Sequence, residues 1–454
     1  MVRALLAMGV GLALGALVAP LAVPLITGRP PPDAVSRAIG AQLTHTPADP
    51  VTSFYAGRRD RPLWEARGRL RPEAEALVAA LKSVDADDLN PASYGPDRLA
   101  SEVAATRVRP DPALLARTDI DLSHVFAAWV GDLHRPQPQA AWRFVDPAVR
   151  LPSTDPAAIL TAAARAPDLA TALSDARRMN PIYEGLRAAL VAARVNRDPR
   201  AALIAANLER ARALPTDLGP RYILVNPAAE TLWFDAAGAA PRTMPVVVGK
   251  TDNQTPSMIG LVRFALFNPY WNVPPDLVRE KIAPSVLREG LGFMARRRFE
   301  ALADFSPNAA VVDPAAVDWS AVATGARVLR VRQLPGGDNM MGQVKFMLPN
   351  SLGIYLHDTP LRGLFAADVR TDSHGCVRLK DAARLAQWIF GHPVAPSAAG
   401  GPDQRADVSP PIPVYILYLT VQPSADGGVV FLPDIYARDP ALLAALAARP
   451  ARSG

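Results

Sequence analysis

The feature that most constrains the fold is a change of pattern near residue 218. From Asp33 to about Leu214 the chain is rich in Ala and Leu at helical spacing, with Pro and Asp separating the runs. After Gly219 it breaks into short β-branched and aromatic runs joined by turn residues. Helices and strands in consecutive blocks predict an α+β chain. We expect an all-helical domain (29–217) followed by a mostly β domain (218–422) that resembles a sandwich or barrel.

Two further segments stand apart from these blocks. Residues 276–323 interrupt the strands with a helical pattern and a loop. Because an insertion of this size in a β domain is more often functional than idle, we expect a helix-loop lid there. Residues 423–454 are expected to form a C-terminal hairpin and helix.

The N-terminus resembles an export segment. Arg3 precedes a charge-free apolar stretch, residues 4–26, which is long enough to span roughly 30 Å of hydrocarbon. No clear small-residue cleavage site follows, and Pro20 and Pro24 stand where cleavage would be expected. We therefore expect residues 1–28 to be an uncleaved membrane anchor rather than a cleaved secretory signal. In either case the body of the protein works outside the cytoplasm.

Composition excludes several classes of function. A single cysteine excludes a disulfide framework, a cysteine-based zinc finger and an iron–sulfur cluster. The formal charge of +6 comes from arginines interspersed with acidic residues, which is typical of a solvated surface, so no nucleic-acid partner is expected. No nucleotide-binding glycine motif is found, and no cofactor or metal is expected.

The single cysteine lies in a segment suited to nucleophilic chemistry. Cys376 stands in the run 373–378, Ser-His-Gly-Cys-Val-Arg, downstream of His357. A free thiol with a pKa of about 8.5 needs a nearby cation, base or helix N-terminus to react at neutral pH. His374 and Arg378 flank the thiol, and Asp381 is suited to cap a helix over 382–390. This environment predicts a reactive cysteine.

Gly375 and His357 complete the candidate constellation. Gly375 lets the backbone turn tightly, so the amides of Gly375 and Cys376 are candidates for binding an oxyanion. Period-two alternation places His357 on one strand face with Tyr355, opposite Leu356. A histidine at this strand end reaches the cysteine if the intervening loop folds back. Two alternatives remain: Cys376 is a buried apolar residue, or it binds zinc with His357, Asp358 and His374, although zinc-motif spacing is missing.

These residues resemble the signature of the L,D-transpeptidases, which carry a YkuD-type catalytic domain. The segments 357–360 and 373–378 align histidine, glycine, cysteine and arginine in register. Other stretches resemble the large YcbB-like branch of Gram-negative envelopes: residues 54–55, 61–64, 89–91, 207–210, 248–250, 254–256, 267–274 and 344–346. Members of that branch usually carry a small peptidoglycan-binding module between their helical and catalytic parts. Here residues 183–195 run almost directly into 202–214, which leaves no room for it.

The resemblance implies a two-step acyl transfer in the periplasm on peptidoglycan stem peptides. Cys376 would attack the third residue of a tetrapeptide stem and expel the terminal D-alanine, and an amine of another stem would resolve the thioester as a 3→3 cross-link. His357 would be the base. The supporting or substrate-binding candidates are His374, Ser373, Arg378, Asp358, Tyr355 and Trp271. For three of them an alternative stays open: a backbone carbonyl instead of Asp358 could orient His357, Arg378 could form a structural ion pair, and Trp271 could be core packing.

Two alternative functions are compatible with some of these residues. Water instead of an amine could resolve the thioester, which would make the protein an L,D-carboxypeptidase or cross-link hydrolase. A non-catalytic envelope scaffold, anchored to the inner membrane by residues 4–26, is the alternative of another class. Other cell-wall synthesis proteins are candidate partners in each case.

Overall fold

The structure is a computed structural model that describes residues 33–149, 151–236, 242–397, 400–424 and 426–449. The expected anchor segment, residues 4–26, lies outside the described residues. Among the described residues, no helix combines the length and the apolar character needed to cross a bilayer.

Three helices of the N-terminal half begin at proline and are capped by aspartate. Asp49, Asp111 and Asp155 each accept a hydrogen bond from an amide in the first turn of the following helix, and proline occupies that first turn. A proline there costs nothing because the first-turn amides have no intrahelical partner. The helices are α1 (Ala34–Leu43), α2 (Pro50–Gly57), α3 (Glu73–Leu81), α4 (Pro96–Val108), α5 (Pro112–His134), α6 (Pro156–Arg165), α7 (Leu169–Arg177), α8 (Pro181–Val195) and α9 (Ala201–Ala211).

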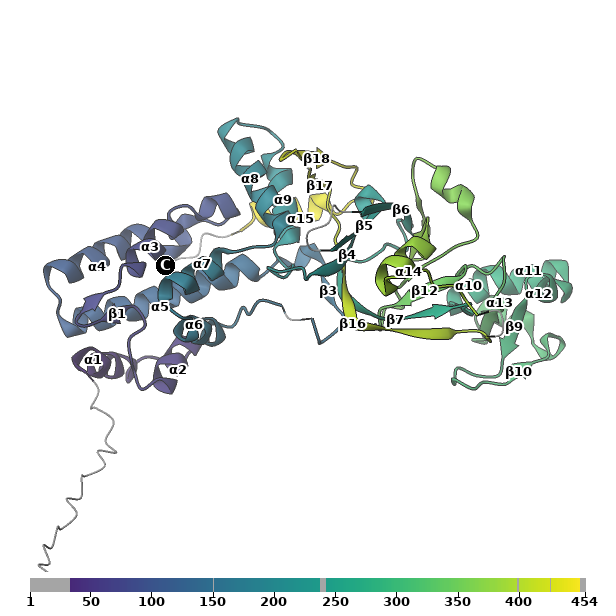
Figure 1. The fold of residues 1–454 in the computed structure, drawn as a ribbon, viewed down its shortest axis with the longest axis horizontal. Helices are drawn as coiled ribbons and strands as arrows, with labels where there is room; N and C mark the ends of the chain where they lie inside the picture. The colour runs from purple at the N-terminus through teal and green to yellow at the C-terminus, as the bar shows by residue number, and fades with distance from the viewer. Residues whose placement is uncertain (1–32, 150, 237–241, 398–399, 425, 450–454) are drawn as a thin grey trace, which may run out of the picture.

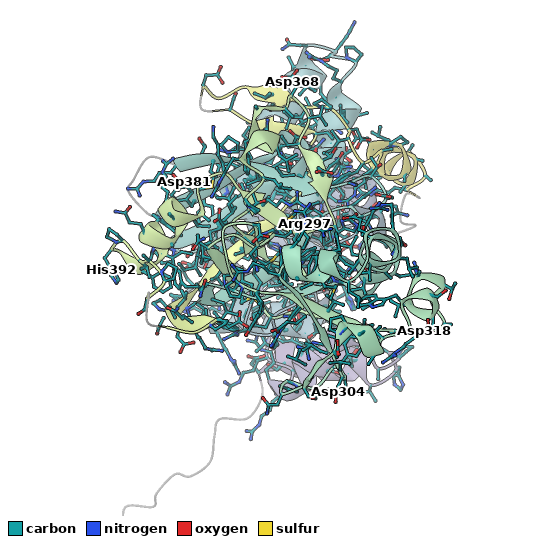
Figure 2. All side chains as sticks on the ribbon, turned by 90° about the vertical axis from the view of Figure 1, so that its right-hand side faces the viewer. Arg297, Asp304, Asp318, Asp368, Asp381 and His392 are labelled. Atoms are coloured by element: carbon teal, nitrogen blue, oxygen red, sulfur yellow. The ribbon has the colours of Figure 1, made fainter. Side chains whose placement is uncertain are left out.

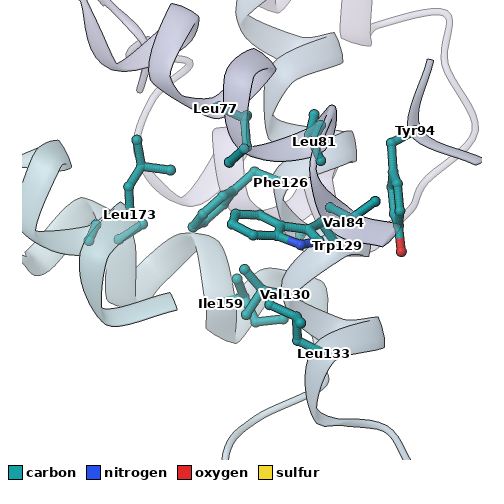
Figure 3. Packing of buried hydrophobic residues seen from close by; sticks show 14 of the residues in the cluster. Leu77, Leu81, Val84, Tyr94, Phe126, Trp129, Val130, Leu133, Ile159 and Leu173 are labelled. Atoms are coloured by element: carbon teal, nitrogen blue, oxygen red, sulfur yellow. The ribbon is translucent and has the colours of Figure 1, made fainter. Parts of the chain in front are cut away.

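The core of this half forms around the long helix α5. Phe126 and Trp129 pack edge-to-face with ring centroids 6.4 Å apart, and Leu77 of α3 and Leu173 of α7 close over them (Figure 3). Residues three apart lie on one face of a helix, so α5 presents a continuous apolar stripe to its neighbours. Figure 3 also shows Ile159 of α6 reaching the same cluster.

The helical half also contains short strands, which its sequence pattern did not indicate. A two-residue hairpin joins β1 (Glu65–Ala66) to β2 (Arg69–Leu70). β3 (Arg143–Phe144) pairs in parallel with β7 of the second half, so one strand of the large sheet comes from the helical half. Strands this short carry too few residues for a period-two pattern.

The second half contains a closed, barrel-like sheet. Its strands follow the order β12-β13-β15-β6-β5-β4-β16-β7, and β12 also pairs with β7, which closes the ring. The strands are β4 (Arg221–Asn226), β5 (Thr231–Ala236), β6 (Arg242–Gly249), β7 (Met258–Phe267), β12 (Val344–Met347), β13 (Leu356–His357), β15 (Val377–Leu379) and β16 (Gln404–Ile416); β14 (Thr371–Ser373) pairs with β6 beside the ring. This confirms the expected α+β class with a mostly β second half.

Successive residues along each strand of the closed sheet point alternately into its interior and outward. Phe346, Leu356 and Val377 are fully buried in a core that also takes the apolar face of α14 (Ala382–Phe390). On the other side of the sheet, Tyr415 and Leu417 join the core of the helical half. The helical half therefore packs against one part of the outer surface of the closed sheet. Another part of that outer surface is left for a functional site.

The C-terminal segment returns to the helical half. β17 (Val421–Pro423) and β18 (Val429–Phe431) form a hairpin, and α15 (Asp439–Ala447) lies against α9. The buried Arg210 of α9 donates to Asp439 at 2.6 Å and to Thr420 at 3.2 Å. A buried charge pair with further hydrogen bonds is costly to break, so it fixes the last helix in place.

The inserted segment is larger and more ordered than a helix-loop lid. It has its own sheet in the order β10-β9-β11-β8 and its own core around Val331 and Trp319. The expected bounds, 276–323, miss the two strands that close it, and the unit runs from Trp271 to Gln333. It forms the right-hand end of the molecule in Figure 1 and faces the viewer in Figure 2, where Asp304 and Asp318 are labelled. Its elements are β8 (Trp271–Val273), α10 (Pro275–Leu277), a π-helical turn (Val278–Ile282), α11 (Ala283–Glu289), α12 (Gly292–Arg296), β9 (Phe299–Leu302), β10 (Val311–Val312), α13 (Trp319–Thr324) and β11 (Arg330–Gln333).

Short 3-10 turns connect these elements. They are Val84–Asp87, Pro91–Tyr94, Pro138–Ala140, Pro227–Ala229, Pro314–Ala316 and Arg362–Ala366.

Candidate active site

Three neighbouring strands place the candidate residues on one outer face of the ring. β13 pairs in parallel with β15, with Leu356 opposite Val377 and His357 opposite Arg378. Paired residues point to the same side of a sheet, so the two apolar residues enter the core and His357 and Arg378 point outward. Cys376 immediately precedes β15, beside Tyr355. The loop between the strands therefore folds back, as the sequence hypothesis requires.

His357 is held as a neutral base. It is 2% exposed, and its Nδ1 lies 2.5 Å from the carbonyl oxygen of Asp358. A carbonyl only accepts, so Nδ1 carries the proton and Nε2 keeps its lone pair. Burial lowers the pKa of His357 to about 3, and the charges of Arg378 and Lys345 push the pKa in the same direction. The imidazole is therefore neutral at physiological pH, with Nε2 free to accept a proton.

The Asp358 carboxylate does not orient His357; its own backbone carbonyl does. The carboxylate accepts from the amide of Gln343 at 2.9 Å and from Arg362 at 2.6 Å. Of the two alternatives, the backbone carbonyl is therefore the group that orients His357 in the structure. The Asp358 side chain instead stabilises the loop after β13.

The thiol of Cys376 is partly exposed and protonated. Its Sγ donates to the carbonyl of Gly353 at 3.3 Å, and the Tyr355 hydroxyl hydrogen-bonds to the sulfur. Burial raises the pKa of the thiol to about 11, and Tyr355, Arg378 and Lys345 offset only part of that rise. The raised pKa of the thiol and the lowered pKa of His357 thus favour a neutral thiol and a neutral imidazole in the resting site.

Asp381 caps α14 as predicted, accepting from the amide of Arg384 at 2.9 Å. The apolar face of α14 packs into the same core as Val377, the residue that follows Cys376.

The turn before the cysteine is locked by hydrogen bonds. The buried Ser373 hydroxyl donates to the Cys376 carbonyl at 2.5 Å and accepts from the Gly375 amide at 3.2 Å. Gly375 has φ +99°, and a Cβ there would lie 3.0 Å from the Ile354 side chain. Thr255 Oγ1 donates to the Gly375 carbonyl at 2.8 Å. Glycine is thus required, but its amide is already engaged, which corrects its assignment as an oxyanion donor.

The structure shows no role for two of the predicted site residues. His374 is exposed. Trp271 packs against Phe299, ring centroids 6.1 Å apart, inside the inserted unit. For Trp271 the core-packing alternative is therefore the one in the structure.

Arg378 belongs to the site face. Its guanidinium lies 3.8 Å from the exposed carboxylate of Asp372, while its Nη1 is buried without a hydrogen-bond partner. A buried donor left unpaired costs free energy, and a ligand oxygen would satisfy it.

The sequence hypothesis missed Lys345. This lysine of β12 pairs with His357 across the strands, is 7% exposed, and donates from Nζ to the Tyr270 carbonyl at 3.3 Å. Its charge acts on both Cys376 and His357. The available signal was a lysine between two apolar residues of a strand, Val344 and Phe346, which marks the outward face. Within the described ranges no His, Cys, Asp and Glu cluster fits a metal ion.

The raised pKa of the Cys376 thiol predicts how its alkylation rate depends on pH. At pH 8 a pKa of about 11 leaves roughly one thiol in a thousand ionised, so alkylation by iodoacetamide should be slow. The rate constant, followed by intact-protein mass spectrometry, should rise about tenfold per pH unit from 7 to 10. Cys376→Ser gives the blank. A plateau below pH 8 would instead mean a thiolate–imidazolium pair and contradict the assigned protonation states.

The comparisons with known proteins agree with this site. Residues 220–396 match the L,D-transpeptidase catalytic domain family, and residues 49–190 match a scaffold domain family. Residues 220–396 are therefore similar to L,D-transpeptidase catalytic domains, and residues 49–190 are similar to a scaffold domain family.

One curated relative and one solved structure show the extent of the likeness. The chain is 33% identical over 248 residues to "Putative L,D-transpeptidase" of Haemophilus influenzae, covering 52% of this chain and 48% of the relative. The chain thus spans about half the length of that relative. An L,D-transpeptidase from Mycobacterium smegmatis aligns with 14% identity and a TM-score of 0.22, covering 43% of this chain and 58% of that one. A TM-score this low supports no further conclusion.

Proposed function

We propose that this protein is a peptidoglycan L,D-transpeptidase that forms 3→3 cross-links through a thioester on Cys376. The observation that carries the proposal is the neutral His357, whose Nδ1 donates to the Asp358 carbonyl and whose side chain lies on the face of the sheet where Cys376 precedes β15. A neutral imidazole on the same face as a partly exposed thiol is the arrangement that cysteine acyl transfer needs.

In the first step the sulfur attacks the carbonyl of the third stem residue. The thiol leaves its hydrogen bond to Gly353 and gives its proton to Nε2 of His357 as the S–C bond forms. Collapse of the tetrahedral intermediate breaks the C–N bond to the terminal D-alanine, and the imidazolium protonates the leaving amine. Tyr355, Lys345 and Arg378 stabilise the negative charge that develops on the sulfur during the step.

In the second step an amine from another stem attacks the thioester. His357 takes the proton of the incoming amine, the C–S bond breaks, and the thiol is restored. The amide of Cys376 is the donor that we assign to the oxyanion in both steps, because the Gly375 amide is bound to Ser373.

Arg378 is our candidate for binding the carboxylate of the leaving residue. It stands two residues from Cys376 on the same face, and its buried Nη1 makes no hydrogen bond and lies 3.8 Å from a carboxylate oxygen of Asp372. We expect Arg378→Gln to raise KM for a tetrapeptide donor about tenfold with little change in kcat, because the carboxylate is held equally in ground and transition states. Steady-state kinetics on tetrapeptide and tripeptide stems check this. A tenfold fall in kcat with an unchanged KM would contradict a binding role.

The substrate class implies a periplasmic enzyme. We extend the proposal to an uncleaved anchor formed by residues 4–26 in the inner membrane. Membrane fractionation followed by N-terminal sequencing tests it: the intact N-terminus in the membrane fraction supports the anchor, and a soluble protein that begins after residue 26 refutes it.

Product analysis tests the reaction itself. Purified disaccharide-tetrapeptides are incubated with the enzyme, and the products are separated and fragmented. Cross-linked dimers with a bond between two third residues support transfer. Shortened monomers alone would mean that water resolves the thioester, which would make the protein a carboxypeptidase. No turnover with intact Cys376 would favour a non-catalytic scaffold.

A further inference from the structure

The carbonyl of Gly375 is held by a threonine from a distant segment. Thr255 is fully buried, and its Oγ1 donates to this carbonyl at 2.8 Å while it accepts from the amide of Gly249 at 2.9 Å. A hydroxyl carries a single hydrogen, so the Gly249 amide occupies a lone pair and leaves that hydrogen for Gly375. The direction of the hydrogen bond to the Gly375 carbonyl is therefore fixed.

This hydrogen bond also orients the amide of Cys376, because the two groups belong to one peptide unit. The Gly375 carbonyl and the Cys376 N–H lie in one plane and point in opposite directions across their trans peptide bond. Gly375 has φ +99°, and glycine adopts either sign of φ readily, so the glycine itself does not stop this peptide unit from rotating. Thr255 therefore aims the amide that we assigned as the oxyanion donor.

Thr255 is in turn held by the C-terminal segment. The hydroxyl of the buried Tyr436 donates to the Gly249 carbonyl at 2.8 Å and accepts from the Thr255 amide at 3.3 Å. Arg438 donates from Nη2 to the Thr255 carbonyl at 3.1 Å. Both backbone polar groups of Thr255 are thus bound by residues outside 220–396, the range that matches the catalytic domain family.

The C-terminal segment is itself fixed against the helical half. Tyr436 stacks on Tyr418 with ring centroids 5.2 Å apart, and its amide donates to the Tyr418 hydroxyl at 3.0 Å. That hydroxyl donates to Asp434 at 2.6 Å, and Asp434 also accepts from the amide of Asp439 at 2.8 Å. Asp439 pairs with Arg210 of α9. A continuous series of printed-sequence neighbours and hydrogen bonds therefore runs from α9 to the turn before the cysteine.

We propose that Thr255 and Tyr436 are positioning residues for acyl transfer, which hold the Cys376 amide in the orientation that stabilises the oxyanion. This role rests on the proposed function, because an oxyanion donor matters only if Cys376 forms an acyl-enzyme. Loss of the Thr255 hydroxyl releases the Gly375 carbonyl, so the peptide unit rotates away. Loss of the Tyr436 hydroxyl has a smaller effect, because Thr255 keeps its own hydrogen bond to Gly375.

Two reactions of the same sulfur separate positioning of the amide from general damage to the site. Acylation by a stem peptide passes through an oxyanion and needs the amide donor. Alkylation by iodoacetamide displaces iodide from carbon and forms no oxyanion. A variant that only misplaces the Cys376 amide therefore slows acylation and leaves alkylation unchanged.

Four variants of the full chain test this. Thr255→Val replaces the hydroxyl with a methyl group, Thr255→Ser keeps the hydroxyl, and Tyr436→Phe keeps the stacked ring. Tyr415→Phe is the matched control, because this buried tyrosine also loses one hydrogen bond, to the Leu218 carbonyl at 3.0 Å, but packs in the core of the helical half. Each is assayed for acylation of Cys376 by disaccharide-tetrapeptide, for kcat and KM, for alkylation, and for its melting temperature.

We expect Thr255→Val to slow acylation by about 10–100-fold and Tyr436→Phe by about 3–10-fold, because a misplaced donor weakens stabilisation of the transition state. The loss should fall on kcat, with KM and the alkylation rate within about twofold of the native values. Thr255→Ser should recover most of the rate. Tyr415→Phe should lower the melting temperature without changing kcat. If Thr255→Val does not fold, Tyr436→Phe decides alone.

Three results would overturn these assignments while leaving the proposed function intact, provided that the native enzyme is acylated. They are native acylation rates in Thr255→Val and Tyr436→Phe, an equal change in acylation and alkylation, and a Thr255→Ser rate as low as that of Thr255→Val. Absence of acylation in the native enzyme would overturn the proposed function and the positioning role together.

Discussion

His357→Gln should lower kcat/KM for dimer formation by about 10²–10⁴, because the glutamine side chain cannot accept the thiol proton. Glutamine preserves a polar side chain of similar reach, so the fold and the pairing of β13 with β15 should survive. Both steps of the proposed reaction use Nε2. The measurement is initial rates on disaccharide-tetrapeptide, with product dimers quantified by chromatography.

His392→Gln is the matched control for that experiment. This exposed histidine follows α14 and is labelled in Figure 2, and its Nδ1 contacts only the Pro393 carbonyl, at 3.1 Å. We expect its rate to stay within twofold of the native enzyme. If His357→Gln behaved like His392→Gln, the assignment of His357 as the base would be wrong.

Asp119→Ala should destabilise the helical half by roughly 3–5 kcal/mol, because several buried donors lose their acceptor together. Asp119 is fully buried in α5 and accepts from the Tyr55 hydroxyl at 2.5 Å and from the amides of Leu63 at 2.9 Å and Trp64 at 2.7 Å. Burial raises its pKa to about 6, so the carboxylate is mostly ionised at neutral pH. Urea denaturation at pH 7.5, followed by circular dichroism, measures the change.

Asp121→Ala, two residues along the same helix, is the comparison. Asp121 pairs with Arg98 at 3.3 Å near the surface, and exposed pairs contribute about 0–1 kcal/mol. Equal denaturation midpoints for the two variants would show that the buried network is not what holds the segment 63–64 against α5.

The core of the candidate site could be predicted from the sequence because its signals are local. The alternation of Leu356 with His357 sets which side chain enters the core, and Leu356 is fully buried while His357 faces the site. Asp381 caps its helix because aspartate satisfies first-turn amides wherever the chain places it. Neither inference needed knowledge of a distant residue.

The remaining features depend on contacts between residues far apart in the chain. The buried Lys345 donates to the carbonyl of the distant Tyr270. The Gly375 carbonyl accepts from the hydroxyl of the distant Thr255. The sheet of the inserted unit pairs Trp271 with Gln333, and strands of two to four residues carry no readable period. No local pattern encodes such pairings.

The central claim is that Cys376 becomes acylated, and mass spectrometry of the intact enzyme tests it most directly. The enzyme is mixed with a disaccharide-tetrapeptide and quenched in acid within milliseconds to seconds. We predict an adduct equal to the donor without its terminal D-alanine, located on Cys376 by peptide mapping and absent from Cys376→Ala. An unmodified Cys376 during turnover, or cross-linking by Cys376→Ala, would contradict the account.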